Sequence, residues 1–92
     1  MIFYELATRY DRRQSFYGKA KILEQDGVIT LLSYDTPVAR IKNGKFEINA
    51  NVCDYLLYSN TTLRHIKEFY RQFVEYKSDL KKSDFFAFET NF

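Results

Sequence analysis

The residues of this chain that could act as nucleophile, general base or metal ligand are few. The sequence has one cysteine, Cys53, and one histidine, His65. A thiolate activated by an imidazole base would be the chemistry of a cysteine-dependent hydrolase. Cys53 lies in an apolar stretch, however, which favours a buried thiol that packs as a small hydrophobe. Zinc needs about four ligands at short spacing, so this pair supplies half a site at most. We expect no metal and no other cofactor.

The remaining titratable residues carry no sign of a catalytic centre. His65 follows Arg64 near the start of an expected helix, where positive charge opposes protonation, so we expect a neutral, hydrogen-bonding imidazole. Carboxylate pairs such as Asp35 with Glu47 are not distinguished by spacing from turn and surface residues. No glycine-rich phosphate loop is present. We expect a non-enzymatic protein, and a small hydrolase or nuclease is a third hypothesis without support.

Basic residues interleaved with aromatic ones form the first candidate binding stretch. Residues 9–21 contain five cations and three aromatic rings, and the alternation of an expected strand there would aim Tyr17, Lys19 and Lys21 at the same side. Such a face could stack bases and neutralise phosphates. A solvated strand face that protects a sheet edge is the commoner meaning of this pattern. The candidates in this stretch are Tyr10, Arg12, Arg13, Tyr17, Lys19 and Lys21.

A second candidate stretch lies on the expected helix. Arg64, Lys67 and Arg71 recur at three- and four-residue steps and form a positive stripe, which Glu68 partly interrupts. This stripe could meet phosphate groups or an acidic protein. The formal net charge is only +2, from 14 basic and 12 acidic side chains. Any basic patch must therefore be local, with acidic residues concentrated elsewhere.

One hairpin is the strongest local prediction among the elements that must position these residues. An Asn-Gly dipeptide separates alternating runs at residues 38–42 and 45–49. This dipeptide tolerates the positive φ angles of a type I′ turn. A two-residue turn fixes the register, so Arg40 should face Glu47 on one side of the hairpin while the other side is apolar.

Three further segments have strand character. Residues 16–24 alternate in part, an Asp-Gly turn signal follows, and residues 28–34 are rich in strand formers. Pro37 donates no amide hydrogen, so a bend or bulge is expected before the next strand. Residues 2–8 could add a fifth strand at an edge. The result is an antiparallel meander of four to five strands.

From residue 60 onward the apolar period changes to that of a helix. The pattern predicts one amphipathic helix from about residue 62 to 77, whose apolar stripe packs across the sheet. Residues 84–92 are rich in phenylalanine, and we expect this aromatic tail to dock as an edge strand, a core cover or part of an interface. The fold class is therefore α+β. The N-cap stays open among Ser59, Asn60, Thr61 and Thr62.

Length and composition indicate the number of domains and the expected cellular compartment. A chain of 92 residues, 46% hydrophobic and 18% aromatic, is one domain, residues 1–92, with enough apolar bulk to fold without disulfides. No apolar run approaches the roughly 20 residues that span a bilayer. The first residues have no features of a signal peptide, and a single cysteine forms no internal disulfide. We expect a cytoplasmic protein without membrane contact.

Two motifs resemble a family of small, uncharacterised proteins encoded by bacteriophages and mobile elements of Gram-positive bacteria. Residues 33–41 are similar to a Ser-Tyr-x-Thr-x-Val-Ala-x-Ile pattern, and residues 58–69 to a Tyr-Ser-x-Thr-Thr-x-Arg-His-x-x-x-Phe pattern. The resemblance covers residues 16–72 and places a helix after a short sheet. The sequence departs from the pattern at residues 50–57, which lengthen the approach to the second motif, and at residues 73–74.

The resemblance implies a phage-type accessory protein that binds a host protein or ribonucleoprotein complex in the bacterial cytoplasm. The most specific version of this hypothesis is an inhibitor of a bacterial defence system, similar to an anti-CRISPR protein. This step rests on analogy. The alternative is an accessory protein that binds DNA or RNA directly. A homodimer through the tail or a sheet edge is equally open. The contact residues would be Tyr10, Arg12, Arg13, Tyr17, Arg64, Lys67 and Arg71 for a protein partner, and Arg12, Arg13, Lys19 and Lys21 for a nucleic acid.

Overall fold

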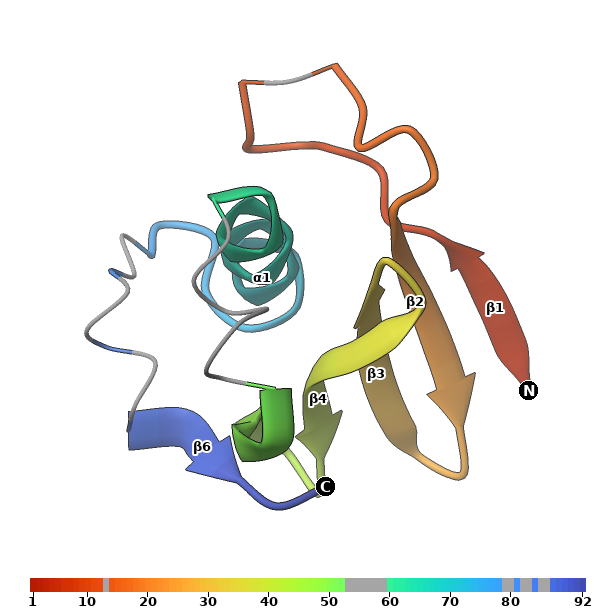
Figure 1. The fold of residues 1–92 in the computed structure, drawn as a ribbon, viewed down its shortest axis with the longest axis vertical. Helices are drawn as coiled ribbons and strands as arrows, with labels where there is room; N and C mark the ends of the chain where they lie inside the picture. The colour runs from red at the N-terminus through yellow and green to blue at the C-terminus, as the bar shows by residue number, and fades with distance from the viewer. Residues whose placement is uncertain (13, 53–59, 79–80, 82–83, 85–86) are drawn as a thin grey trace.

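The strands form one six-stranded sheet, and an α-helix packs against it (Figure 1). The computed structural model describes residues 1–12, 14–52, 60–78, 81, 84 and 87–92. Strands β1 to β5 form an antiparallel meander in chain order, and β6 joins β5 in parallel. The expected α+β fold is confirmed, and the tail supplies the sixth strand. The elements are β1 (Ile2–Glu5), β2 (Ala20–Gln25), β3 (Val28–Ser33), β4 (Thr36–Lys42), β5 (Lys45–Asn49), the 3-10 helix η1 (Ala50–Val52), α1 (Asn60–Phe73) and β6 (Glu89–Thr90).

The hairpin of β4 and β5 has the expected register. Lys42 pairs with Lys45 and Arg40 with Glu47, and the turn residues Asn43 and Gly44 have φ angles of 54° and 76°. Both angles are positive, as a type I′ turn requires. The Arg40 Nε atom lies 2.7 Å from the Glu47 carboxylate, so the cross-strand pair is formed.

A bulge lies beside Pro37 as expected, but inside β4 and not before it, because β4 begins at Thr36 rather than at residue 38. The expected edge strand is also present. Leu31 pairs with Ala39 but Leu32 pairs with Pro37, so Val38 is an extra residue on β4. Pro37 cannot donate to the ladder, which explains why the irregularity falls beside it. β1 pairs with β2 and forms one edge of the sheet.

Strand β2 begins four residues later than the sequence pattern indicates. The predicted start was Phe16, but the chain turns there: the Lys19 amide donates to the Phe16 carbonyl at 3.0 Å. Tyr17 and Gly18 have φ angles of 54° and 75°, which a strand does not allow. The prediction that Tyr17, Lys19 and Lys21 share one face of a strand is therefore wrong, because two of the three precede β2.

The helix also ends earlier than predicted, at Phe73 rather than near residue 77. The Glu75 amide donates to the Tyr70 carbonyl at 3.0 Å, one residue further back than an α-helical bond. The Glu75 carboxylate then accepts from the Lys77 amide at 3.1 Å, which favours a turn over another helical turn. No helix of the described residues has the length and apolar character needed to span a bilayer.

The core lies between α1 and the facing side of the sheet. Ile66 and Phe69 from α1 are fully buried, as are core residues of β2, β3, β4 and β5. Each fully buried aliphatic or phenyl side chain stabilises the fold by about 1.5–3 kcal/mol. Leu6 and Phe16 are buried in the same cluster. They anchor both ends of the segment between β1 and β2, residues 6–19, hereafter the β1–β2 loop.

The described part of the aromatic tail is docked. The Phe88 ring lies 5.1 Å from the Phe46 ring, edge to face, and the Arg40 guanidinium lies 4.1 Å from the Phe92 ring centroid. These contacts bring the end of the chain onto the β4–β5 hairpin. Phe85 and Phe86 lie outside the described residues.

Candidate functional site

A basic groove runs between α1 and the β1–β2 loop and has a volume of about 790 Å³. It brings together five of the nine candidate binding residues, from segments more than fifty positions apart in the sequence. Leu63, Asp11 and Tyr76 complete the described lining. The groove is lined by Tyr10, Asp11, Arg12, Leu63, Arg64, Lys67, Arg71 and Tyr76.

The helix contributes three cations from one side of its surface. Arg64, Lys67 and Arg71 follow the helical repeat, so they are distributed along about 10 Å of helix rise. The Arg71 Nε atom donates to the Ser78 carbonyl at 3.0 Å. This bond holds the turn after α1 against the helix, and the same turn carries Tyr76 into the groove lining.

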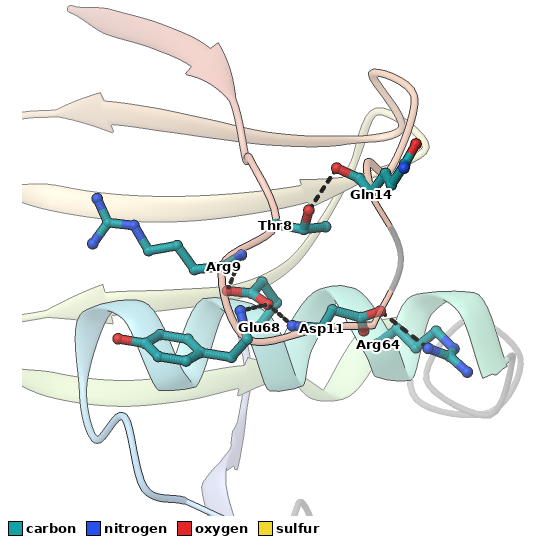
Figure 2. Close-up of polar contacts among 7 residues, drawn as sticks. Thr8, Arg9, Asp11, Gln14, Arg64 and Glu68 are labelled. Carbon is teal, nitrogen blue, oxygen red and sulfur yellow. Dashed lines mark hydrogen bonds and ion pairs between the residues drawn. The ribbon is translucent and has the colours of Figure 1, made fainter.

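Glu68 holds the opposite wall of the groove in place. Its carboxylate accepts hydrogen bonds from three successive backbone amides, those of Arg9 at 3.2 Å, Tyr10 at 3.0 Å and Asp11 at 2.7 Å. Figure 2 shows the Glu68 side chain pointing from α1 to the backbone of the β1–β2 loop. Hydrogen bonds to a charged acceptor are about twice as strong as neutral ones. The loop is thus pinned to the helix at the residues that form the groove wall.

Two further contacts brace the same junction. The Gln72 amide nitrogen donates to the Glu68 carboxylate at 2.5 Å and to the Ala7 carbonyl at 2.6 Å. The Thr8 hydroxyl donates to the Gln14 carbonyl at 2.7 Å and closes the base of the loop (Figure 2). These bonds join the loop to itself and to α1 on either side of Tyr10.

The charge of the groove follows from this arrangement. Glu68 is 1% exposed and faces the loop backbone, so it does not interrupt the positive stripe, contrary to the sequence expectation. Asp11 is the only carboxylate of the described lining, and it lies 3.1 Å from Arg64. Four cations against one carboxylate leave a formal excess of three positive charges in the groove.

The groove also presents aromatic surface to solvent. Tyr10 is 43% exposed and Tyr76 is 58% exposed. One ring comes from the loop wall and the other from the turn after α1, so aromatic and cationic groups share one concave surface. Aromatic rings beside cations on such a surface are typical of macromolecular binding sites.

The other candidate residues lie away from the groove. Tyr17 is 76% exposed on the turn before β2. The Lys19 ammonium lies 5.5 Å from the Tyr34 ring, and Lys21 is paired with Asp35 at 2.8 Å. The structure therefore separates Tyr17, Lys19 and Lys21 from the groove residues. Arg13 lies outside the described residues.

His65 belongs to a buried polar cluster between α1 and β3. Its Nδ1 atom lies 2.8 Å from the Ser33 hydroxyl, which is 3.2 Å from the Thr62 hydroxyl. The Phe16 ring packs edge to face on the imidazole at 4.6 Å. This is the hydrogen-bonding role expected of His65. Cys53 lies outside the described residues, and within the described ranges no three His, Cys, Asp or Glu side chains gather as metal ligands would.

The candidate residues did not include Asp11, Leu63 and Tyr76 of the lining, nor Glu68, which holds the loop. The helical pattern predicts that Glu68 interrupts the positive stripe, because its partners are backbone amides 57 to 59 positions away that leave no sequence signal. Tyr76 was assigned to the last turn of the helix. The early end of α1 places it in the groove instead, and the Glu-x-Lys spacing that forms the local bond is the only signal for that end.

Comparison with known proteins identifies the family and nothing beyond it. Neither the curated proteins nor the solved structures contain a match to this chain. One family model covers residues 4–86, which include the end of β1, the β1–β2 loop, β2 and the whole of α1. The chain belongs to the family of unknown function DUF8033.

Proposed function

We propose that this protein is a non-enzymatic binding protein that holds an anionic segment of a macromolecular partner in the basic groove. The observation that carries the proposal is the convergence of four cations on a groove whose one described carboxylate is paired with Arg64. Glu68, the acidic residue closest in sequence to the stripe, is buried against backbone amides. A polyanion in the groove therefore meets net attraction along its length.

The lining supports contact rather than turnover. Among the described lining residues there is no histidine, cysteine or serine, and Asp11 is in an ion pair. The described lining consists mainly of cations and tyrosines. These side chains are suited to neutralising charge and to packing against flat rings.

The charges of the groove support an anionic partner. A ribonucleoprotein complex of a host defence system, which the resemblance to phage proteins implies, would present such an anionic segment. In that case the protein would act in the bacterial cytoplasm by occupying a surface that the complex needs. An acidic protein segment is a second partner that the groove charges would accept.

Salt-dependent binding of simple polyanions tests this function. Fluorescence anisotropy of labelled oligothymidylate, oligoglutamate and inorganic polyphosphate should show binding that weakens with salt. For a single strand each neutralised phosphate contributes about −0.7 to the slope of log affinity against log salt. With four lining cations, one shared with Asp11, we expect a slope of about −2 to −3 for a bound single strand.

A matched pair of variants assigns the binding to the groove. Lys67→Gln should weaken binding and reduce the size of the slope by about 0.7, whereas Lys42→Gln, at the exposed end of the β4–β5 hairpin, should leave both unchanged. The function is refuted if none of the three polyanions binds at low salt. Equal effects of the two variants would also contradict it.

A further inference from the structure

We propose that the anionic segment is single-stranded nucleic acid, with bases stacked on Tyr10 and Tyr76 and phosphates held by Arg12, Lys67 and Arg71. This inference rests on the proposed function and deepens it by naming the ligand class. It assigns the two tyrosines a role in stacking bases, which a ligand bound only through its negative charges would not need.

The exposure of the two rings is the first argument. Tyr10 and Tyr76 leave 43% and 58% of their surface in solvent, in the same concave lining as the cations. Exposed aromatic surface within a binding groove is suited to a ligand that offers flat π surfaces. Every nucleobase has such a face, whereas an acidic peptide offers carboxylates without rings.

The way the rings are held is the second argument. The Tyr10 amide is bound by Glu68 at 3.0 Å, so the backbone below this ring is fixed before any ligand arrives. The turn that carries Tyr76 is held by the bond from Arg71 to Ser78, and the Lys77 ammonium lies 5.5 Å from the Tyr76 ring. Fixed positions reduce the ordering entropy that binding must overcome.

The spacing of the cations is the third argument. Arg64 and Arg71 are separated by about 10 Å along the helix axis, and the phosphates of a stacked strand advance by about 3.4 Å each along the axis of that strand. The helix therefore spans several phosphates of one strand, and Arg12 on the loop wall approaches the same strand from the other side of the groove.

Stacking on the tyrosines also requires an unpaired strand. In a duplex each base already stacks on its neighbours and pairs across the helix, so its faces are not available to a protein ring without unstacking. A duplex would meet the groove through its phosphates alone. We therefore expect single strands to bind more tightly than duplexes of the same length and sequence.

The test compares oligothymidylate with an abasic oligonucleotide of equal length, which keeps the phosphates and lacks the bases. Tyr10→Ala and Tyr76→Ala should each lower the affinity for oligothymidylate about 5- to 150-fold, as loss of one base stack does. Tyr10→Phe and Tyr76→Phe should stay within about twofold, because phenyl rings stack equally well. The abasic strand should bind more weakly than oligothymidylate, with an affinity that neither alanine variant changes.

A third variant controls for loss of any exposed tyrosine. Tyr17→Asn removes a ring that is 76% exposed outside the groove, and asparagine accepts the positive φ of that position. It should leave binding unchanged. Circular dichroism of each variant verifies that the fold is retained. We expect it to be retained because all three side chains are exposed.

Failure of this inference is distinguishable from failure of the proposed function. Base stacking would be overturned, and groove binding left intact, by either of two results. One is equal affinity for the abasic strand and oligothymidylate; the other is native affinity of both alanine variants for oligothymidylate. Binding of oligoglutamate but not of oligothymidylate would overturn the nucleic-acid ligand in favour of an acidic protein. Absence of binding to every polyanion would overturn both proposals.

Discussion

Glu68→Ala should lower the free energy of unfolding by about 3 kcal/mol, because a buried donor that loses its acceptor costs roughly 1–3 kcal/mol. Three backbone amides and the Gln72 amide donate to this carboxylate. After the change, water can reach some of the four donors. The loss of stability therefore stays below the sum of four separate penalties for unpaired donors. The midpoint of thermal unfolding should fall by about 12–24 °C for a domain of this size.

Two comparison variants make the Glu68 prediction specific. Glu68→Gln keeps the shape and one acceptor oxygen, so its loss of stability should be intermediate. Glu75→Ala removes an exposed carboxylate with one local bond, and should change the free energy of unfolding by about 0.5 kcal/mol or less. Denaturant unfolding measures all three. A Glu68→Ala variant as stable as Glu75→Ala would mean that this carboxylate does not hold the β1–β2 loop.

Proteolysis separates a detached loop from general unfolding. Trypsin cleaves after arginine, and the loop carries Arg9 and Arg12. If Glu68 pins the loop, Glu68→Gln should be cut within the loop much faster than the native protein under conditions where both remain folded, because local opening exposes the backbone. Unchanged cleavage there would contradict the pinning.

The largest expected effect on binding is that of a double charge reversal. Arg12→Glu combined with Lys67→Glu should lower the affinity for oligothymidylate about 1,000-fold or more. Each change removes an attractive contact and adds a like-charge one, and such juxtapositions cost several kcal/mol. The two residues lie on opposite walls of the groove, so no single strand could avoid both. Anisotropy at low salt measures the loss.

A second double reversal controls for overall charge. Lys42→Glu with Lys45→Glu changes the net charge by the same amount at an exposed cross-strand pair outside the groove lining. The two side chains carry like charges before and after the change, so the free energy of unfolding should stay the same. This variant should bind within a few-fold of the native protein. If it loses as much affinity as the groove variant, attraction is to the whole molecule and not to the groove.

Local patterns predicted those parts of the fold that local chemistry determines. The β4–β5 register followed from one Asn-Gly turn, because a two-residue loop leaves no freedom in pairing. The bulge followed from the missing amide of Pro37. The existence of α1 followed from the apolar repeat, whose members Ile66 and Phe69 lie in the core.

Element ends and the composition of the site depended on contacts that local patterns do not reveal. β2 starts late because Tyr17 adopts a positive φ that bulky residues seldom adopt. α1 ends early because Glu75 bonds the Lys77 amide. The grouping of Tyr10 and Arg12 with the helix cations depends on bonds between Glu68 and amides far away in the chain. Periodicity could therefore indicate these residues as candidates but could not predict that they lie together.

The most direct test of groove binding is a residue-by-residue map of the bound oligonucleotide by nuclear magnetic resonance. Titration of isotope-labelled protein with oligothymidylate should shift the backbone amides of residues 10–12, of the α1 segment 63–71 and of Tyr76, the segments that line the groove. Shifts confined to Tyr17, Lys19 and Lys21, or an unchanged spectrum at low salt, would contradict the groove as the binding surface.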